Sequence, residues 1–262
     1  ARGHLPIAEW LLQVSKEKGQ DINISAYDEE AFRWACGKGH LQVAQWLLQV
    51  SKEKGQDINI STRDEEAFRW ACSNGHLEVA QWLLQVKPDI DISAESEDAI
   101  WCACINGHLD VAQWLFKLSL TVNISANNDE LFVYVCADGH LDVCQWLLQV
   151  KPDIDISAYD EEAFRWACKN GHLHICKWLL QVKPDINISA ENEEAFREAC
   201  YYGHLELCKW LLQIKRNINI SIWNERVFRE ACMYNHLQVA QWLQSLKPYL
   251  YVIEYDENGK YK

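Results

Sequence analysis

The chain has 262 residues, with 25 Lys and Arg against 38 Asp and Glu, so its formal net charge is −13. This charge opposes nonspecific binding to nucleic-acid phosphates or anionic membranes, and we expect neither as a partner. No apolar run approaches the length of a membrane-spanning helix, and the first residues show no signal-peptide pattern.

The tripeptide Gly-His-Leu recurs along the whole chain. Its copies begin at Gly3, Gly39, Gly75, Gly107, Gly139, Gly171 and Gly203, and an eighth copy reads Asn235-His236-Leu237. The first two intervals are 36 residues and the others are 32. Such a period indicates stacked repeats that share one continuous core.

The repeats divide the chain into one partial unit and seven full ones. The units are 1–26, which is partial, 27–62, 63–94, 95–126, 127–158, 159–190, 191–222 and 223–254, followed by a flexible tail at 255–262. The first unit begins in mid-repeat, so we expect the sequence to be a piece of a longer protein. The apolar stretch at 249–253 either folds back as a cap or leads into a further segment.

Each full unit predicts a pair of helices, as the unit at 27–62 illustrates. Asp28 can cap the first helix, with Glu29 and Glu30 in its first turn, where the helix dipole favours acids. Its expected buried face carries Ala31, Phe32, Ala35 and Cys36. Gly39 ends this helix, because glycine adopts the left-handed conformation without strain.

The second helix of the unit carries an apolar face and a polar stripe. The apolar residues are Leu41, Ala44, Trp46, Leu47 and Leu48, and the polar stripe is Gln42, Gln45 and Gln49. The Asp-Ile-Asn-Ile-Ser segment that follows alternates in polarity, which predicts a short strand-like return. The first two units leave the second helix through Ser-Lys-Glu-Lys-Gly-Gln, which predicts one extra helical turn, whereas Lys-Pro in later units ends the helix early.

Ten of the eleven cysteines occupy two fixed positions of the repeat. Seven precede the turn (Cys36, Cys72, Cys104, Cys136, Cys168, Cys200 and Cys232), and Cys144, Cys176 and Cys208 take a position that is Ala in other units. A position shared by Cys and Ala is a small core position. Equivalent positions lie about 10 Å apart along a stack, too far for a disulfide or a metal array. Many free thiols indicate a reducing, intracellular compartment, and we expect the cytoplasm.

A histidine and a tryptophan recur in every unit. They are His4, His40, His76, His108, His140, His172, His204 and His236, and Trp10, Trp46, Trp82, Trp114, Trp146, Trp178, Trp210 and Trp242. Each histidine lacks a nearby second ligand, so we interpret it as a structural residue whose ring bonds neighbouring backbone. The tryptophans are interpreted as core. With no nucleophile–base pair and no glycine-rich phosphate loop, we expect no enzyme, no metal and no cofactor.

The order of helix, Gly-His-Leu turn, helix and Asp-Ile-Asn resembles the ankyrin repeat. The matching residues are Ala35-Cys36, Gly39-His40-Leu41, Leu47-Leu48 and Asp57-Ile58-Asn59. The family's Thr-Pro-Leu-His is here Glu30-Ala31-Phe32-Arg33, and most units are one residue short, so we expect finger hairpins of nonstandard length. The resemblance implies an all-α, ankyrin-like solenoid of helix-turn-helix repeats. The Trp-rich copies are also similar to arrays of large DNA viruses that infect protists, which would place the protein in a host cytoplasm.

Positions that vary within a strict repeat are candidates for partner contacts. They precede Ala-Cys, lie four residues later on the same helical face, or lie in the loop before the first helix. The residues that we expect to contact a partner are Tyr27, Trp34, Arg63, Trp70, Tyr134, Tyr159, Trp166, Tyr202, Trp223 and Tyr234. Exposed aromatic residues with interleaved charge are typical of interface hot spots. The alternative is that these rings fill gaps between adjacent helices.

Five arginines each follow an acid by four residues, and we interpret them as ion pairs on solvated helix faces. They are Arg33, Arg69, Arg165, Arg197 and Arg229.

We therefore expect a monomeric scaffold that binds a protein partner on the concave face that the resemblance implies. A second hypothesis is that the array recruits substrates for a ubiquitin-ligase adaptor or acts as a viral host-range factor. A third is that Asn23, Asn59, Asn123, Asn187 and Asn219 resemble ankyrin asparagines that oxygenases hydroxylate.

Overall fold

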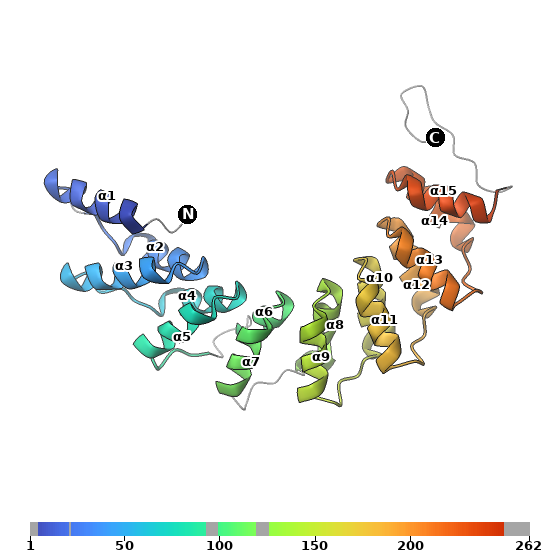
Figure 1. Cartoon of the computed structure of the whole chain (residues 1–262), viewed down its shortest axis with the longest axis horizontal. Coiled ribbons are helices and arrows are strands. Elements are labelled where there is room, and N and C mark those ends of the chain that lie inside the picture. The colour runs from blue at the N-terminus through green and yellow to red at the C-terminus, as the bar shows by residue number, and fades with distance from the viewer. Residues whose placement is uncertain (1–4, 21, 93–98, 119–125, 249–262) are drawn as a thin grey trace, which may run out of the picture. The chain divides into compact units, whose positions relative to one another are not determined.

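The computed structural model describes residues 5–20, 22–92, 99–118 and 126–248, without the side chains of 126–128 and 222–224. These residues form fifteen α-helices and no β-strand (Figure 1), which confirms the predicted all-α class. The helices are α1 (Leu5–Glu17), α2 (Ala26–Gly37), α3 (Leu41–Glu53), α4 (Thr62–Ser73), α5 (Leu77–Val86), α6 (Ala99–Ile105), α7 (Leu109–Leu118), α8 (Ala126–Asp138), α9 (Leu141–Val150), α10 (Ala158–Lys169), α11 (Leu173–Val182), α12 (Ala190–Tyr201), α13 (Leu205–Ile214), α14 (Ile222–Met233) and α15 (Leu237–Leu246). The apolar stretch at 249–253 and the predicted tail lie outside the described residues.

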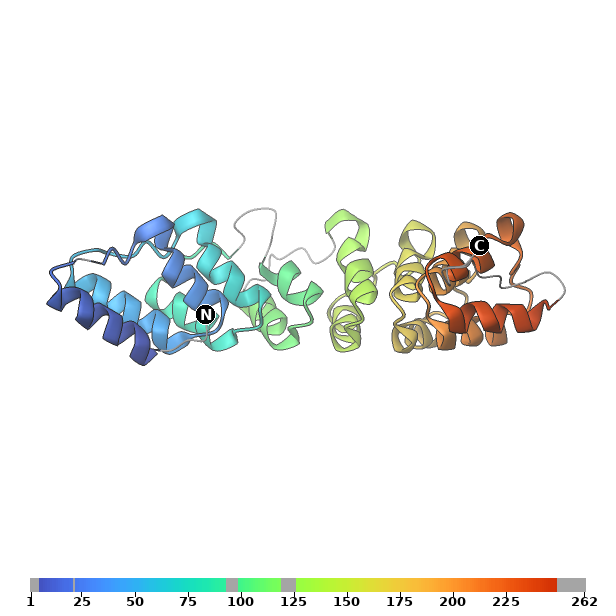
Figure 2. The ribbon, with the colours of Figure 1, turned by 90° about the horizontal axis from the view of Figure 1, so that it is seen from above.

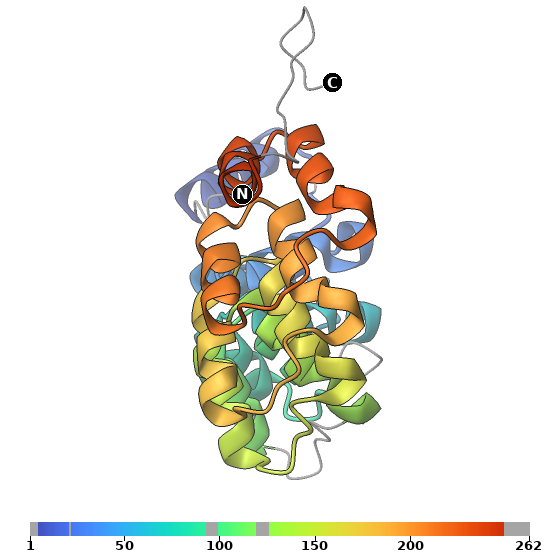
Figure 3. The same cartoon turned by 90° about the vertical axis from the view of Figure 1, so that its right-hand side faces the viewer.

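The helices belong to two compact units, Ala1–Asn123 with α1–α7 and Ile124–Lys262 with α8–α15. Within each unit, the first helices of successive repeats pack on one another, as α2 does on α4 and α10 does on α12. Each first helix also packs on the second helix of its own repeat. Figures 2 and 3 show the resulting two rows of helices in the second unit.

The length of the second helix follows the exit sequence, as predicted. Helices α1 and α3, which end in Ser-Lys-Glu, have 13 residues, whereas α5, α9 and α11, which precede Lys-Pro, have 10. Proline cannot supply the N–H that the next helical turn needs. Gly39 has a φ of +73°, which confirms the predicted left-handed end of the first helix.

The predicted strand-like return is wrong, because the described Asp-Ile-Asn segments pair with no neighbouring strand. Their alternation is nevertheless reflected in burial: Ile58 and Ile60 are buried and the intervening Asn59 is exposed. The Asn59 N–H donates to Glu29 Oε1 of the same repeat at 3.2 Å. The Glu29 carboxylate therefore accepts the hydrogen bond that the Asn59 N–H would donate to a neighbouring strand in a sheet.

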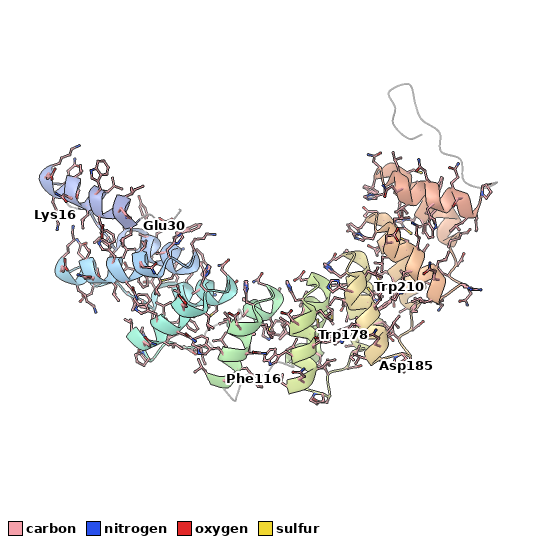
Figure 4. All side chains as sticks on the ribbon, in the orientation of Figure 1. Lys16, Glu30, Phe116, Trp178, Asp185 and Trp210 are labelled. Atoms are coloured by element: carbon pink, nitrogen blue, oxygen red, sulfur yellow. The ribbon has the colours of Figure 1, made fainter. Side chains whose placement is uncertain are left out.

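The core is formed by both helices of each repeat, and aromatic pairs connect it from one repeat to the next. Phe32, Phe68, Phe132 and Phe196 are at most 1% exposed. The ring of each lies 6.2–6.4 Å from a tryptophan on the second helix of the following repeat, namely Trp82, Trp114, Trp178 and Trp242. Figure 4 shows Trp178 and Trp210 on successive second helices. This confirms these four tryptophans as packing residues, and Trp146 is buried, whereas Trp10 is 62% exposed. Ala31, predicted to be buried, is exposed as well.

The predicted start of the first helix is wrong. Tyr27, Asp28 and Glu29 have φ values of 56°, 55° and 62°, so they form a left-handed turn before the regular helix begins at Glu30. The same turn recurs at 63–65, 159–161 and 191–193. A left-handed conformation costs about 1–2 kcal/mol per residue, so specific contacts must hold each turn in place.

An acid at the third position of the turn supplies part of that stabilisation. The Glu161 carboxylate accepts from Ser157 Oγ at 2.7 Å and from the Asn187 N–H at the end of the same repeat at 3.1 Å. Ser61 and Ser189 donate in the same way to Glu65 and Glu193. Each of these acids thus stabilises its own turn, and Glu161 also holds the return segment at the end of its own repeat.

Arginines supply the rest of that stabilisation, and the interpretation as solvated i,i+4 pairs is wrong for Arg33 and Arg165. Arg33 is 4% exposed, and its guanidinium donates to the carbonyl oxygens of Asp28 at 2.7 Å and of Tyr27 at 3.1 Å. It also forms an ion pair with Glu66 of the next repeat. The left-handed turn leaves these carbonyls without helical donors, and the planar guanidinium reaches both of them.

Arg165 repeats this arrangement with Glu194, and Arg69 and Arg197 donate to the corresponding carbonyls.

The recurring histidines join successive turns. His204 Nε2 donates to the Lys169 carbonyl oxygen of the preceding repeat at 2.9 Å. His76 and His172 bond the carbonyls of Gly37 and Ala137, the equivalent positions. These contacts confirm the prediction that the ring bonds neighbouring backbone.

Candidate protein-interaction surface

One side of each first helix faces away from the second helix and carries the variable positions. In the first full repeat these are Trp34 and Lys38, with Glu30 one turn earlier. We call these three positions and their equivalents in other repeats the first-helix face. The Glu30 position was not singled out in the sequence, although an acid recurs there at Glu66, Glu130, Glu162 and Glu194.

In the first unit the first-helix face is aromatic and carries a cation. The rings of Trp34 and Trp70 meet edge to face with centroids 5.7 Å apart, and Lys38 Nζ lies 5.4 Å from the Trp34 centroid. Asn74 Nδ2 donates to the Trp70 carbonyl oxygen at 2.8 Å. A cavity of about 250 Å³ is lined by Trp34, Gly37, Lys38, Trp70, Ser73 and Asn74. It could admit a single side chain of a partner.

In the second unit the same positions bring together a tyrosine, a tryptophan and acids. The centroids of Tyr134 and Trp166 lie 5.6 Å apart, and the Tyr134 hydroxyl donates to Glu130 Oε1 at 3.1 Å. This hydrogen bond to Glu130 raises the pKa of Tyr134, and the charges of Glu130 and Glu162 raise it further. The ring pair is therefore held in an electronegative environment.

Farther along the second unit, three tyrosines form a second aromatic cluster. The Tyr201 ring lies 4.6 Å from that of Tyr234 and 4.9 Å from that of Tyr202, and a hydrogen bond with Tyr234 raises the pKa of Tyr201 to about 12. Lys169 Nζ lies 5.7 Å from the Tyr202 centroid. Tyr201 was missed in the sequence, although its position varies freely from Gly37 to Met233.

The predicted residues of the turn lie at the start of the first helices. Tyr27 is 81% exposed and Tyr159 is 45% exposed. Arg63 is exposed too, but Arg63 Nη2 forms a 3.0 Å ion pair with Asp28 Oδ2 of the preceding repeat. The side chain of Trp223 lies outside the described residues.

The structure thus brings Trp34 together with Trp70 and Tyr134 with Trp166, while Tyr202 and Tyr234 each contact Tyr201.

All the thiols except that of Cys102 are buried inside the repeats, and three close pairs of them were missed in the sequence. The Sγ atoms of Cys136 and Cys144 lie 3.4 Å apart, as do those of Cys168 and Cys176, and those of Cys200 and Cys208 lie 3.3 Å apart. The spacing of about 10 Å applies to equivalent positions of successive repeats, and not to two different positions of one repeat. Burial raises the pKa of Cys136, Cys168 and Cys200, which keeps these thiols protonated and unreactive.

The part of the chain that the structure describes has neither a candidate metal site nor a candidate membrane-spanning helix. No group of three or more His, Cys, Asp or Glu side chains there is arranged to hold a metal ion. None of the described helices combines the length and the apolar character needed to cross a membrane.

Comparisons with known proteins identify the repeat. Models described as ankyrin repeats match residues 1–48, 52–128, 131–224 and 164–256. A search of curated proteins finds no match. Among solved structures, the chain is similar to the crystal structure of the human ASB11 ankyrin repeat domain, with a TM-score of 0.52 and 16% sequence identity over 72% of this chain and 85% of that one. The family models cover nearly all of the sequence, and the chain belongs to the ankyrin repeat family.

Proposed function

We propose that the first-helix face binds a protein partner, with Trp34, Trp70, Tyr134 and Trp166 as central contacts. Ankyrin repeats generally mediate protein–protein interactions. The observation that carries the proposal is the cavity between Trp34 and Trp70. Two large rings border an open cavity there, where packing alone would favour closing the gap.

The composition of this face supports a contact role. The Trp34 side chain is 43% exposed, and its indole can bury a large area at little cost in conformational entropy. Tyr27, Tyr159, Tyr202 and Tyr234 add exposed aromatic surface, each with a hydroxyl that can donate or accept a hydrogen bond. By resemblance to the family, this is the concave side of the array.

Affinity capture from a cell lysate tests the proposal. The array is the bait, beside a variant that carries Trp34→Ala, Trp70→Ala and Trp166→Ala. The matched control is Trp10→Ala, because Trp10 is equally aromatic and more exposed but lies on a second helix. A protein retained by the array and the control but lost by the triple variant would support the site.

Circular dichroism must first show that all three proteins have the same helical content. Equal retention of the captured protein by the triple variant would exclude these rings as contacts and leave them as packing residues.

A further inference from the structure

Three consecutive repeats of the second unit each hold two thiols in contact. Each pair joins the last turn of a first helix to the first turn of the second helix of the same repeat. The pairs are Cys136–Cys144, Cys168–Cys176 and Cys200–Cys208, with Sγ atoms 3.3–3.4 Å apart. In the first unit the second-helix position is alanine, at Ala44, Ala80 and Ala112. The paired arrangement is therefore a property of the repeats at 127–158, 159–190 and 191–222.

The turn between the two helices limits the movement that a covalent bond would require. A disulfide needs a sulfur–sulfur distance of about 2.0 Å, so the two Sγ atoms must approach by roughly 1.3 Å. The Gly139 N–H donates to the Cys136 carbonyl oxygen at 3.3 Å, and the Cys144 N–H donates to the His140 carbonyl oxygen at 3.0 Å. These bonds hold the adjoining ends of α8 and α9 next to each other (Figure 1), so small side-chain rotations supply the remaining approach.

The six thiols are fully buried, and burial determines when they can react. It raises the pKa of Cys136, Cys168 and Cys200, so thiolate is scarce while a repeat is closed. Local opening of a repeat admits a small oxidant. When the repeat closes again, an oxidised sulfur lies against its partner thiol, and the second step is intramolecular.

We propose that the three cysteine pairs are sites of reversible disulfide formation, with a peroxide as the oxidant, and that each bond locks the two helices of its repeat together. This inference goes beyond partner binding, because it makes the second unit sensitive to the redox state of its surroundings.

The reaction has two steps and consumes one hydrogen peroxide for each pair. A thiolate attacks a peroxide oxygen, the O–O bond breaks, and the sulfur becomes a sulfenic acid while the leaving hydroxide takes up a proton to form water. The partner thiol then attacks that sulfur, the S–O bond breaks, and the hydroxide leaves as water with the thiol proton. The pair loses two electrons and two protons, and the peroxide becomes two waters.

Peptide mapping after oxidation tests the proposal. The whole array carries Cys102→Ser, which removes the partly buried thiol, and is incubated with hydrogen peroxide in native buffer. It is then unfolded and alkylated with iodoacetamide in the absence of a reductant. We expect the six paired cysteines to escape alkylation as three disulfides within repeats, and to be alkylated when dithiothreitol is added first.

The first unit supplies the matched control. Cys144→Ala/Cys176→Ala/Cys208→Ala places in the second unit the alanine that the first unit carries at the same position, so the fold is expected to tolerate it. The three first-helix thiols of this variant are expected to be alkylated after the same treatment. In the converse variant, Ala44→Cys gives Cys36 a partner and is expected to add a fourth disulfide.

The stability of the oxidised protein provides a second measurement. A disulfide restricts the unfolded chain, so the urea midpoint of the parent array is expected to rise on oxidation, whereas that of the triple alanine variant stays unchanged. Complete alkylation of the six cysteines, oxidation that dithiothreitol does not reverse, or bonds between repeats such as Cys136–Cys176 would overturn the inference.

Discussion

Gly171 and Asn235 occupy the same turn position, with φ values of 80° and 61°. The two positions differ in whether a residue of a following repeat packs against them. A Cβ added at Gly171 would lie 2.6 Å from the His204 ring, whereas Asn235 is exposed and no described repeat follows it. The glycine is therefore required by the histidine of the next repeat as much as by its own conformation.

We expect Gly171→Ala to lower the free energy of unfolding by about 2–4 kcal/mol, because left-handed strain and a clash with His204 add together. Urea unfolding followed by circular dichroism measures the change. The control is Asn235→Gly, which is expected to change stability by less than about 1 kcal/mol. An equally small effect of Gly171→Ala would show that the His204 ring moves aside without cost.

Cys102 differs from the other ten cysteines because it is only partly buried. In the native protein we therefore expect iodoacetamide to modify one cysteine quickly, and Cys102→Ser to abolish that phase. Mass spectrometry after limited reaction identifies the modified residue. Rapid labelling of any of the thiols at Cys136, Cys168 or Cys200 would contradict their burial.

At the scale of single residues, the sequence predicted correctly those features that recur at the same position of every repeat. The turn glycines, the histidine contacts and the buried cysteines each recur in register. The cysteine pairs could not be predicted from the period alone, because their proximity depends on how two helices of one repeat face each other. The roles of Arg33 and Arg165 were missed for a related reason: helical spacing was assumed back to Glu29 and Glu161, which lie in the left-handed turn.

The left-handed turn is the element that departs most from sequence expectation. A Tyr-Asp-Glu sequence favours an ordinary helix start, and only tertiary contacts can select the strained form. Arg165 donates to the carbonyl oxygens of Tyr159 and Asp160, both at 2.8 Å, and pairs with Glu194. One guanidinium thus links the turn of its own repeat to the next repeat.

We expect Arg165→Lys to destabilise the array by about 2–4 kcal/mol, because lysine keeps the charge but cannot reach two carbonyls and a carboxylate at once. Chemical unfolding measures this, with Arg216→Lys as control because Arg216 is exposed. The control is expected to stay within about 0.5 kcal/mol of the parent. If both variants behave alike, the arginine acts through its charge alone.

Across the whole molecule, repeats are joined by contacts that recur from one to the next. Aromatic pairs, arginine–glutamate ion pairs and histidines each join neighbouring repeats, so stability within each unit depends on nearest-neighbour interfaces. The sequence period predicted this stacking. It could not predict which acids of the first-helix face are paired, because pairs such as Arg165–Glu194 join different repeats.

The environment of the recurring histidines makes the stability of the fold depend on pH. Burial lowers the pKa of His76, and the nearby His108 and His40 lower it further. Burial also lowers the pKa of His172, and His174 acts in the same sense. In the unfolded chain these rings titrate near their ordinary pKa of 6.5, so between that value and the lowered one the unfolded state binds more protons.

Stability must therefore fall as pH decreases below about 6.5, and we expect a lower Tm at pH 5.5 than at pH 7.5. Differential scanning calorimetry measures the difference, and NMR titration of the ring protons assigns it to His76 and His172. The window lies above the ordinary range of exposed carboxylates, so their protonation contributes little. A Tm that stays constant or rises toward pH 5.5 would mean that the histidines accept protons as readily in the stack as in the unfolded chain, and that their contacts with the preceding repeat do not require the neutral ring.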